Sequence, residues 1–293
     1  MKKRLTIFTG PTASGKTRRA IEYALLLDTE IVSCDSRQCY SELNIGVARP
    51  SEEELAAVPH HFIACRSVRQ PWNVYDYEQE AMALLHCLFE THNEVVAVGG
   101  SGLYVEALCQ GVAVMPDPAP GLREQLQQRL EVEGIASLQE ELQRLDPDYY
   151  ARVDRQNPAR LQRALEVCLT TGQPYIRILA EQEPASRPFD IDVRVVSPDL
   201  EDLRRRIDTR VDQMFAQGLF EEASSLWHLR HLNTLNTVGY REFYVYDTPE
   251  QASANLADIA TRIKLDTWHY AKKQITWCKK KYPHGSVRYL ADV

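Results

Sequence analysis

The chain has 293 residues, of which 44% are hydrophobic and 26% are charged, and its formal net charge is −7 at pH 7. This size and composition allow one large α/β domain, with or without an insertion, and the absence of a long apolar run or a secretory leader predicts a cytoplasmic protein without membrane contact. The negative charge argues only weakly against a nucleic-acid partner, because a basic surface can form locally within an acidic average.

A phosphate-binding loop is predicted near the N-terminus. The apolar run over residues 5–9 is followed by the stretch GPTASGKT, residues 10–17, which fits the pattern G-x-x-x-x-G-K-[ST]. In such loops backbone N–H groups close on phosphate oxygens at the positive end of the next helix. Lys16 adds a charge there, and the Thr17 hydroxyl can bind Mg²⁺. A molecule that carries a di- or triphosphate is therefore expected to bind here.

Strands, loops and helices then alternate along the first third of the chain. Periodicity predicts, in chain order, a strand over 5–9, a helix over 18–27, strands over 30–34 and 61–65, a helix over 76–89 and a strand over 94–98. Such alternation is typical of a parallel sheet with helices on both faces. Ligands of these sheets bind at the carboxyl ends of the strands, where Gly10, Asp35 and Gly99 fall.

The middle of the chain has a different character. Prolines at positions 116, 118 and 120 exclude regular structure and indicate a boundary or hinge. Beyond them only helices are predicted up to about residue 180, over 122–133, 137–145 and 158–171, the last ending at Gly172. A strand over 191–196 and helices over about 200–217 and 256–281 follow, with Leu200 facing inward and Gly218 ending the first of them. We expect a core of residues 1–114 and 190–293 and an all-helical insertion of residues 115–189.

Asp35, at the end of the second strand, has more than one possible role. Its carboxylate can cap the next turn, or hold Mg²⁺ through water as in phosphate-loop NTPases. It can also accept a proton from a nucleophile that attacks the carbon bearing a bound diphosphate. The residue type and its position leave these roles open.

A set of sequence blocks resembles the tRNA dimethylallyltransferase (tRNA isopentenyltransferase) family. Besides the phosphate loop, the matching blocks lie at residues 35–40, 59–61, 99–104, 157–166, 172–174, 206–219, 238–242 and 270–277. They run in the family's order over nearly the whole chain. The chain has no Cys/His set at zinc-finger spacing, so it is similar to the short bacterial form. The resemblance implies an α/β fold with a phosphate-loop NTPase-like parallel sheet, helices on both faces and an inserted all-helical domain.

The resemblance also implies a reaction. Members transfer the dimethylallyl group from dimethylallyl diphosphate to N6 of adenosine 37, beside the anticodon of tRNA, and release pyrophosphate. Asp35 is then the general base, while Lys16, Arg210 and Mg²⁺ on Thr17 stabilise the departing pyrophosphate. The residues expected to bind the diphosphate are Gly10, Thr12, Ala13, Ser14, Gly15, Lys16, Thr17 and Arg210. Those expected to contact the tRNA anticodon loop are Asp35, Ser36, Arg37, Gln38, Ser101, Arg123, Ala159, Arg160, Leu161, Gln162, Arg163 and Arg241. A monomer is expected.

Two other activities use the same loop. A small-molecule kinase or NTPase would use residues 31–35 as a Walker-B-like strand, although no separate base or Arg-rich lid is evident. Prenyl transfer to free adenine nucleotides is the other, and the Arg-bearing insertion argues for a larger acceptor. Trp268 stands where the family commonly has an arginine, which concerns tRNA affinity or choice rather than the reaction. For Trp268, Tyr270 and Trp277 a packing role in the core is expected.

Overall fold

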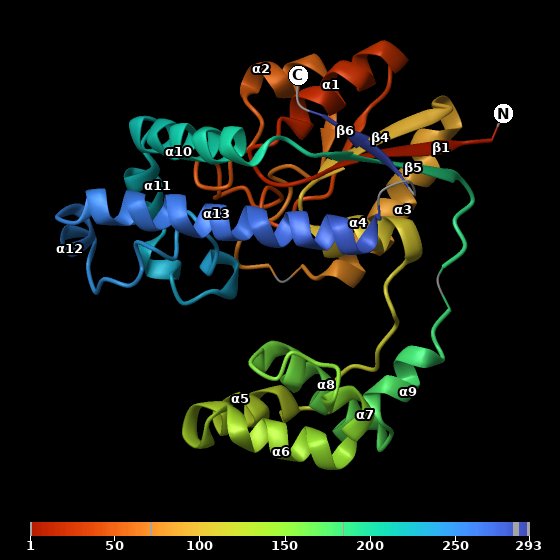
Figure 1. Ribbon diagram of the computed structural model, residues 1–293, viewed down its shortest axis with the longest axis vertical. Coiled ribbons are helices and arrows are strands. Elements are labelled where there is room, and N and C mark those ends of the chain that lie inside the picture. Colours follow the sequence, from red (N-terminus) through yellow and green to blue (C-terminus); the bar gives the residue numbers. More distant parts are fainter. Residues whose placement is uncertain (1, 71, 184, 284–286, 292–293) are drawn as a thin grey trace. The chain divides into compact units, whose positions relative to one another are not determined.

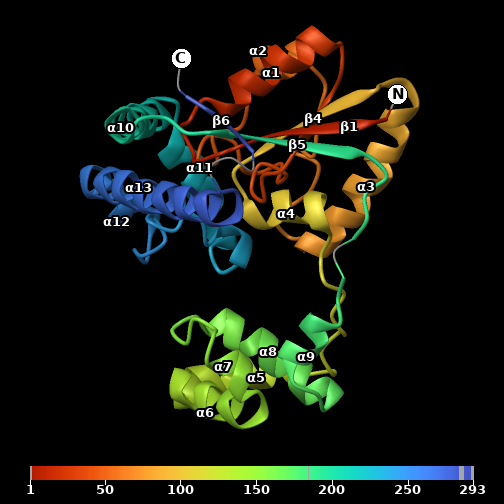
Figure 2. The same cartoon turned by 45° about the vertical axis from the view of Figure 1, so that its right-hand side comes forward.

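The computed structural model describes residues 2–70, 72–183, 185–283 and 287–291. It divides into two compact units, which Figures 1 and 2 show from two directions. Unit 1 comprises Met1–Gln110 with Arg187–Val293, and unit 2 comprises Gly111–Ser186. The first junction precedes the Pro-rich stretch and the second precedes the returning strand, so each lies a few residues before the boundaries expected after residues 114 and 189.

Unit 1 is built on a six-stranded sheet of parallel strands in the order β3-β2-β4-β1-β5-β6. The strands are β1 (Arg4–Thr9), β2 (Ile31–Ser33), β3 (His60–His61), β4 (Glu94–Gly99), β5 (Asp190–Val196) and β6 (Arg288–Leu290). In the centre, Thr9 of β1 is in register with Gly99 of β4 and Val195 of β5. The loops after β1, β2 and β4 therefore leave the sheet at the same edge, as the sequence predicts.

Helices cover both faces of this sheet. They are α1 (Lys16–Leu27), α2 (Glu52–Ala57), α3 (Val74–Thr91), α4 (Gly102–Gln110), α10 (Leu200–Ala216), α11 (Leu219–Ser225), α12 (Pro249–Ser253) and α13 (Leu256–Lys281), with short 3₁₀ turns η1 (Trp227–Leu229) and η2 (Asn233–Leu235). Figures 1 and 2 show α1 on one face and α3 and α4 on the other. On the first face, Ala20, Ile21 and Ala24 of α1 pack against Phe8 and Val96 of the sheet. The predicted fold class is confirmed.

The described part of unit 2 contains helices as its only regular elements. They are α5 (Leu122–Glu133), α6 (Ile135–Leu145), α7 (Pro147–Tyr150), α8 (Pro158–Thr171) and α9 (Tyr175–Ala180). Leucines at the facing positions of α5, α6 and α8 form its apolar core. The Asn157 side chain accepts a hydrogen bond from the N–H of Arg160 at the start of α8, and Gly172 ends that helix with φ of 68°. Both ends of α8 follow from these local caps.

Two expectations about local structure are wrong. The strand expected over 61–65 is limited to the two-residue β3, because Phe62 and Ala64 have positive φ and interrupt the extended chain. Leu200 is 54% exposed, since it begins α10 instead of lying within its buried face. The expected stop at Gly218 is confirmed, because α10 ends at Ala216 and Gly218 follows the cap residue Gln217 with φ of 98°.

None of the described helices combines the length and apolarity that a membrane-spanning helix requires. The cytoplasmic location stays a prediction. All seven cysteines are free thiols.

Glu222 of α11 anchors the loop formed by residues 44–50 to the rest of unit 1. Its carboxylate accepts hydrogen bonds from the N–H groups of Ile45 (2.9 Å) and Gly46 (3.0 Å) and from the hydroxyl of Tyr240 (2.5 Å). Gly46 packs so closely that an added Cβ would lie 2.5 Å from the Tyr240 ring. Three donors thus depend on one acceptor group.

We expect Glu222→Ala to lower the free energy of unfolding by about 2–4 kcal/mol, because donors in a partly buried site would lose their acceptor. Urea denaturation measures the change. The control is Glu221→Ala, since Glu221 is exposed on the same helix. Equal losses in the two variants would show that the anchor contributes nothing specific.

Candidate active site

The phosphate loop joins β1 to α1 in the predicted place. Gly10 has φ of 146°, and a Cβ there would lie 2.4 Å from the carbonyl oxygen of Val196 on β5, so only glycine fits. Gly15, with φ of 80°, directly precedes α1 and directs the helix's first N–H groups toward the loop. The buried Ser14 hydroxyl has no hydrogen-bond partner among the described groups. A phosphate oxygen would satisfy it.

Lys16 lies within this loop as a partly buried cation. Its Nζ donates to the carbonyl of Pro11 at 3.1 Å. Burial of the ammonium group lowers the pKa of Lys16 from 10.5 to about 8, while the charge of Asp35 opposes the shift and that of Arg210 adds to it. Because burial disfavours the charged form, a bound anion would stabilise it.

Arg210 approaches the loop from α10. Its Nη1 lies 3.5 Å from the Thr12 hydroxyl, and burial of the guanidinium lowers the pKa of Arg210. In the described part of the chain neither Arg210 nor Lys16 forms an ion pair with a carboxylate within 4 Å. Two cations therefore lie on the phosphate loop, Lys16 at the Pro11 carbonyl and Arg210 at the Thr12 hydroxyl, which suits a ligand with more than one negative charge.

Asp35 presents the two oxygens of its carboxylate to different surroundings. Oδ1 accepts from the N–H groups of Arg37 (2.9 Å) and Gln38 (3.2 Å), so the turn-capping role is present. Oδ2 has no hydrogen-bond partner among the described groups. The caps fix the carboxylate and leave one oxygen available to a substrate.

Ser101 connects the loops after β4 and β2. Its Oγ accepts the N–H of Ser36 at 3.0 Å and donates to the Ser36 hydroxyl at 3.2 Å. Tyr270, expected in the core, is instead 41% exposed, but its hydroxyl end lies beside Ser101. Burial of that hydroxyl raises the pKa of Tyr270 to about 12, and the charge of Asp35 adds to the shift.

The side chains of Arg37 and Gln38 make contacts within the protein. Arg37 Nη1 donates to the carbonyl of Thr234 at 3.2 Å. Gln38 Nε2 donates to the carbonyls of Val47 (3.3 Å) and Ala48 (2.9 Å). These bonds hold the loop that carries Asp35, and the expected tRNA contacts of both residues stay predictions.

Gln274 of α13 is a site residue to which the sequence analysis gave no role. Its Oε1 accepts the N–H of Thr12 at 2.8 Å, and its Nε2 donates to the carbonyl of Gly100 at 2.8 Å. It thereby ties the loop after β1 to the loop after β4. Its helical spacing from Ala271 and Cys278 places Gln274 on the buried face of α13. An amide among otherwise apolar buried residues is the sequence feature that could have identified it.

Two arginines of unit 2 that were expected to bind tRNA are engaged with one buried carboxylate. Arg123 binds both oxygens of Glu166 through Nε (2.8 Å) and Nη2 (3.2 Å), and Arg163 Nη1 lies 3.1 Å from the same group. Burial would raise the pKa of Glu166, but the hydrogen bonds from Arg123 and Arg163 outweigh it and lower the pKa. Much of their charge is compensated inside unit 2.

The first turns of α8 carry the other expected contacts of unit 2. Ala159 and Arg160 are exposed, and Arg160 has no ion pair in the described part of the chain. Gln162 donates to the side chain of Gln127 at 3.1 Å. Leu161 is fully buried in the core of unit 2, so the expectation that it contacts RNA is wrong. Within this segment Arg160 is the group best suited to a phosphate.

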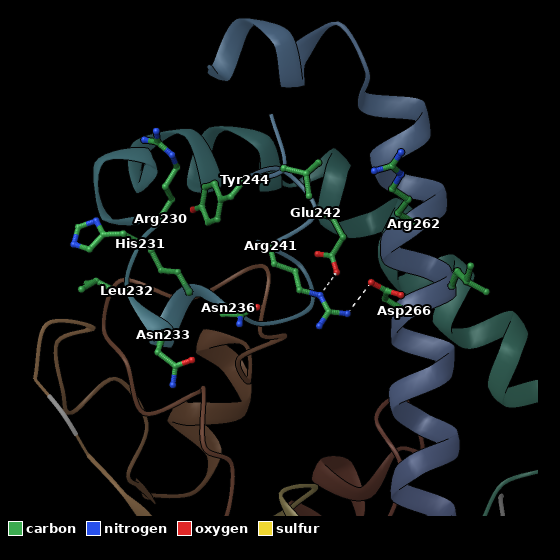
Figure 3. Close-up of a pocket in the computed structure, with 13 residues that line it drawn as sticks. Arg230, His231, Leu232, Asn233, Asn236, Arg241, Glu242, Tyr244, Arg262 and Asp266 are labelled. Atoms are coloured by element: carbon green, nitrogen blue, oxygen red, sulfur yellow. Dashed lines mark hydrogen bonds and ion pairs between the residues drawn. The ribbon is translucent and has the colours of Figure 1, made fainter. Parts of the chain in front are cut away.

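Arg241 lies in unit 1 beside a surface pocket of about 690 Å³, shown in Figure 3. Its Nε is 3.0 Å from Glu242 and its Nη2 is 2.7 Å from Asp266. Both edges of the guanidinium thus have carboxylate partners, and its expected contact with tRNA stays a prediction.

Magnesium also stays a prediction. No group of three or more His, Cys, Asp or Glu side chains in the described residues can hold a metal ion. The Thr17 hydroxyl, in the first turn of α1, has no hydrogen-bond partner among the described groups. This arrangement fits a Mg²⁺ ion that is bound by the Thr17 hydroxyl and by phosphate oxygens of the substrate. Binding through few protein groups and substrate phosphates is common for Mg²⁺.

The fold and the site are those of a phosphate-loop α/β protein, with two cations at the loop and a carboxylate at the same sheet edge. Comparison with known proteins gives the family. The family model described as IPP transferase matches residues 38–281. The tRNA dimethylallyltransferase 2 of Porphyromonas gingivalis is 42% identical over 276 residues, which cover 94% of this chain and 91% of that protein. The chain belongs to the IPP transferase family, as the resemblance predicts.

Solved structures agree with this assignment. The tRNA isopentenylpyrophosphate transferase from Bacillus halodurans matches with a TM-score of 0.70 and 29% identity, covering 99% of this chain and 90% of that one. A eukaryotic dimethylallyltransferase acting on tRNA shares the fold, with a TM-score of 0.83 at 23% identity over 99% of this chain and 74% of that one.

We expect Gln274→Met to raise the KM for a diphosphate donor by roughly 5- to 30-fold, because two buried hydrogen bonds that hold the phosphate loop are lost. Steady-state kinetics with varied donor measure it. Lys273→Ala is the control, since Lys273 is the exposed neighbour on α13. An unchanged KM in Gln274→Met would contradict the positioning role.

The lowered pKa of Lys16 predicts a pH dependence of donor binding. In the free enzyme the amine is protonated below a pH of about 8 and neutral above it. We therefore expect kcat/KM for the donor to fall as the pH rises through about 8. Lys16→Arg keeps its charge at high pH and should lack this fall. If the fall persists in that variant, another group titrates.

Proposed function

We propose that this protein transfers a dimethylallyl group from dimethylallyl diphosphate to N6 of adenosine 37 in tRNA and releases pyrophosphate. The observation that supports it most is the pair of partly buried cations without an ion pair at the phosphate loop, with the free Oδ2 of Asp35 at the same sheet edge. Membership of the IPP transferase family supports tRNA as the substrate class. A monomeric, cytoplasmic enzyme is part of the proposal.

The donor side of the reaction follows from the charges of the loop. When the allylic C–O bond breaks, negative charge grows on the departing diphosphate. The phosphate loop surrounds the departing diphosphate with Lys16, Arg210 and the N–H groups at the start of α1. These groups stabilise the growing negative charge and need not reorganise to do so. When bound, Mg²⁺ would add Lewis-acid stabilisation of the same oxygens.

The acceptor side depends on Asp35. The exocyclic amine of adenine is a weak base, and its proton becomes acidic only as the new N–C bond forms. The free Oδ2 accepts that proton, while Oδ1 stays fixed by the turn. An adenine within a stacked loop must be splayed out to reach this edge of the sheet.

Nucleoside analysis tests the proposal. The purified protein is incubated with unmodified tRNA and dimethylallyl diphosphate, and the tRNA is digested and analysed by mass. We expect one adenosine to gain a dimethylallyl group. Parallel reactions with AMP as acceptor and with ATP alone test prenyl transfer to free nucleotides and the kinase or NTPase activity. Modified AMP or consumed ATP without modified tRNA would contradict the proposal.

We expect Asp35→Asn to slow the transfer by roughly 10²- to 10⁴-fold, the usual scale for one general base. The amide oxygen of asparagine can still accept the two N–H groups of the turn, so the loop should keep its conformation and tRNA binding should be nearly unchanged. Single-turnover kinetics and a filter-binding assay separate the two effects. Unchanged turnover would remove Asp35 from the role of base.

A further inference from the structure

Two cysteines lie opposite each other on adjacent backbone segments of unit 1. Tyr40 and Arg66 form an isolated parallel bridge between these segments. The N–H of Arg66 donates to the carbonyl of Cys39 at 2.9 Å, and the N–H of Ser41 donates to the carbonyl of Arg66 at 2.7 Å. Cys39 and Cys65 each come directly before a member of the bridged pair, so they are neighbours across the two segments.

The spacing of the two segments suits a disulfide bond. On the other side of the cysteine pair, the N–H of Ala64 donates to the carbonyl of Gln38 at 2.9 Å, so both segments are held together there too. Paired strands lie about 4.7–4.9 Å apart, and a disulfide bond needs Cα atoms about 4.4–6.8 Å apart. Residues opposite each other in a parallel pair project to the same side of it. The register therefore brings the two thiols together.

The two thiols differ in their access to solvent. Cys65 is exposed, whereas Cys39 is completely buried and its Sγ lies 3.7 Å from the carbonyl oxygen of Ser36. Of the two, Cys65 can meet an oxidant from solution. Cys39 can then react with a sulfur that is already held at Cys65.

The titration of the thiols sets how fast they can react. Burial raises the pKa of Cys39 to about 12, and the charge of a Cys65 thiolate adds to this shift. Burial also raises the pKa of Cys65. Because the thiolate is the reactive form, exchange is slow at neutral pH and becomes faster as the pH rises. The position of the thiols, rather than their activation, therefore favours the bond.

We propose that Cys39 and Cys65 form a reversible disulfide bond, which cross-links the loop that carries Asp35 to the neighbouring segment under oxidising conditions. The oxidant is a small-molecule disulfide such as oxidised glutathione. The Cys65 thiolate attacks one of its sulfurs and releases one glutathione thiolate. The Cys39 thiolate then attacks Sγ of Cys65 and releases the second. The protein loses two protons and two electrons, and the oxidant becomes two thiols.

The bond would act on the loop that holds Asp35. Gln38, whose N–H donates to Oδ1 of Asp35 at 3.2 Å, directly precedes Cys39. The cross-link closes a ring from Cys39 to Cys65, which includes the loop of residues 44–50 that Glu222 anchors. Such a ring restricts the unfolded chain more than the folded one, so the bond should stabilise the native structure.

Peptide mapping under non-reducing conditions tests the pairing. The native protein is incubated with oxidised glutathione at mildly alkaline pH, and free thiols are blocked before digestion. We expect one cross-linked peptide that contains Cys39 and Cys65 and that a reductant separates. Its rate of formation should rise by roughly tenfold per pH unit, since both thiols are protonated below their raised pKa values.

Three variants identify the roles of the thiols. Cys65→Ser should give no cross-linked peptide, and Cys39→Ala should keep glutathione bound at Cys65. Cys87→Ser is the matched control, because it replaces the other exposed cysteine and should form the bond as the wild type does.

Thermal unfolding tests the effect on the fold. Oxidation should raise the unfolding midpoint of the wild type by about 3–8 °C and leave that of Cys65→Ser unchanged. The inference is overturned if the native protein gives no such peptide, or if the bond forms only in urea. An oxidised wild type whose midpoint is unchanged or lower would equally overturn it, because the bond would then not fit the native loop. None of these measurements depends on dimethylallyl transfer, so they stand apart from the test of the proposed function.

Discussion

Two partly buried positive charges without an ion pair are the constraint on which the site depends. Lys16 bonds the Pro11 carbonyl and Arg210 lies at the Thr12 hydroxyl, and burial lowers the pKa of each. Poorly compensated charge is costly inside a protein, so this arrangement suits a multiply charged anion as its counterpart. The glycine at position 10, wedged against the carbonyl of Val196, makes room for the loop at the centre of the sheet. In the proposed reaction the same charges first bind the diphosphate and then stabilise its growing negative charge as it leaves.

On the acceptor side, hydrogen bonds within the protein fix the side chains and leave single atoms available to a substrate. Asp35 uses one carboxylate oxygen to cap its own turn, which holds the other oxygen in place. Ser101 joins this loop to the one after β4, and Gln274 joins that loop in turn to the phosphate loop. The loops that hold the proposed donor and acceptor sites therefore form one hydrogen-bonded network, and a substitution of Gln274 should affect both sites. Such positioning increases the reaction rate because the reacting groups are already held in the orientation that the reaction requires.

Three of the arginines expected to contact tRNA are paired with carboxylates of the protein. Arg123 and Arg163 share Glu166, and Arg241 lies between Glu242 and Asp266. Charge available to RNA is left on exposed arginines such as Arg160 in unit 2. This distribution explains how a chain with a net charge of −7 can offer local binding sites for a polyanion.

The sequence by itself determined the phosphate loop, the parallel sheet, the caps of α8 and the edge at which Asp35 meets the loop, because each depends on short-range patterns of apolar residues, glycine and turn formers. It did not reveal α11, η1, η2 or α12 between residues 219 and 255, where no periodicity is present. It placed Leu161 on an RNA surface and Tyr270 in the core, and it gave Gln274 no role. The tertiary structure decided those properties, because each depends on a partner far along the chain. Gln274 forms a hydrogen bond with a residue 262 positions away, and Glu166 pairs with an arginine 43 positions away. Local patterns encode which residues form a helix or a loop, whereas the surroundings of a side chain are fixed only when distant segments pack together.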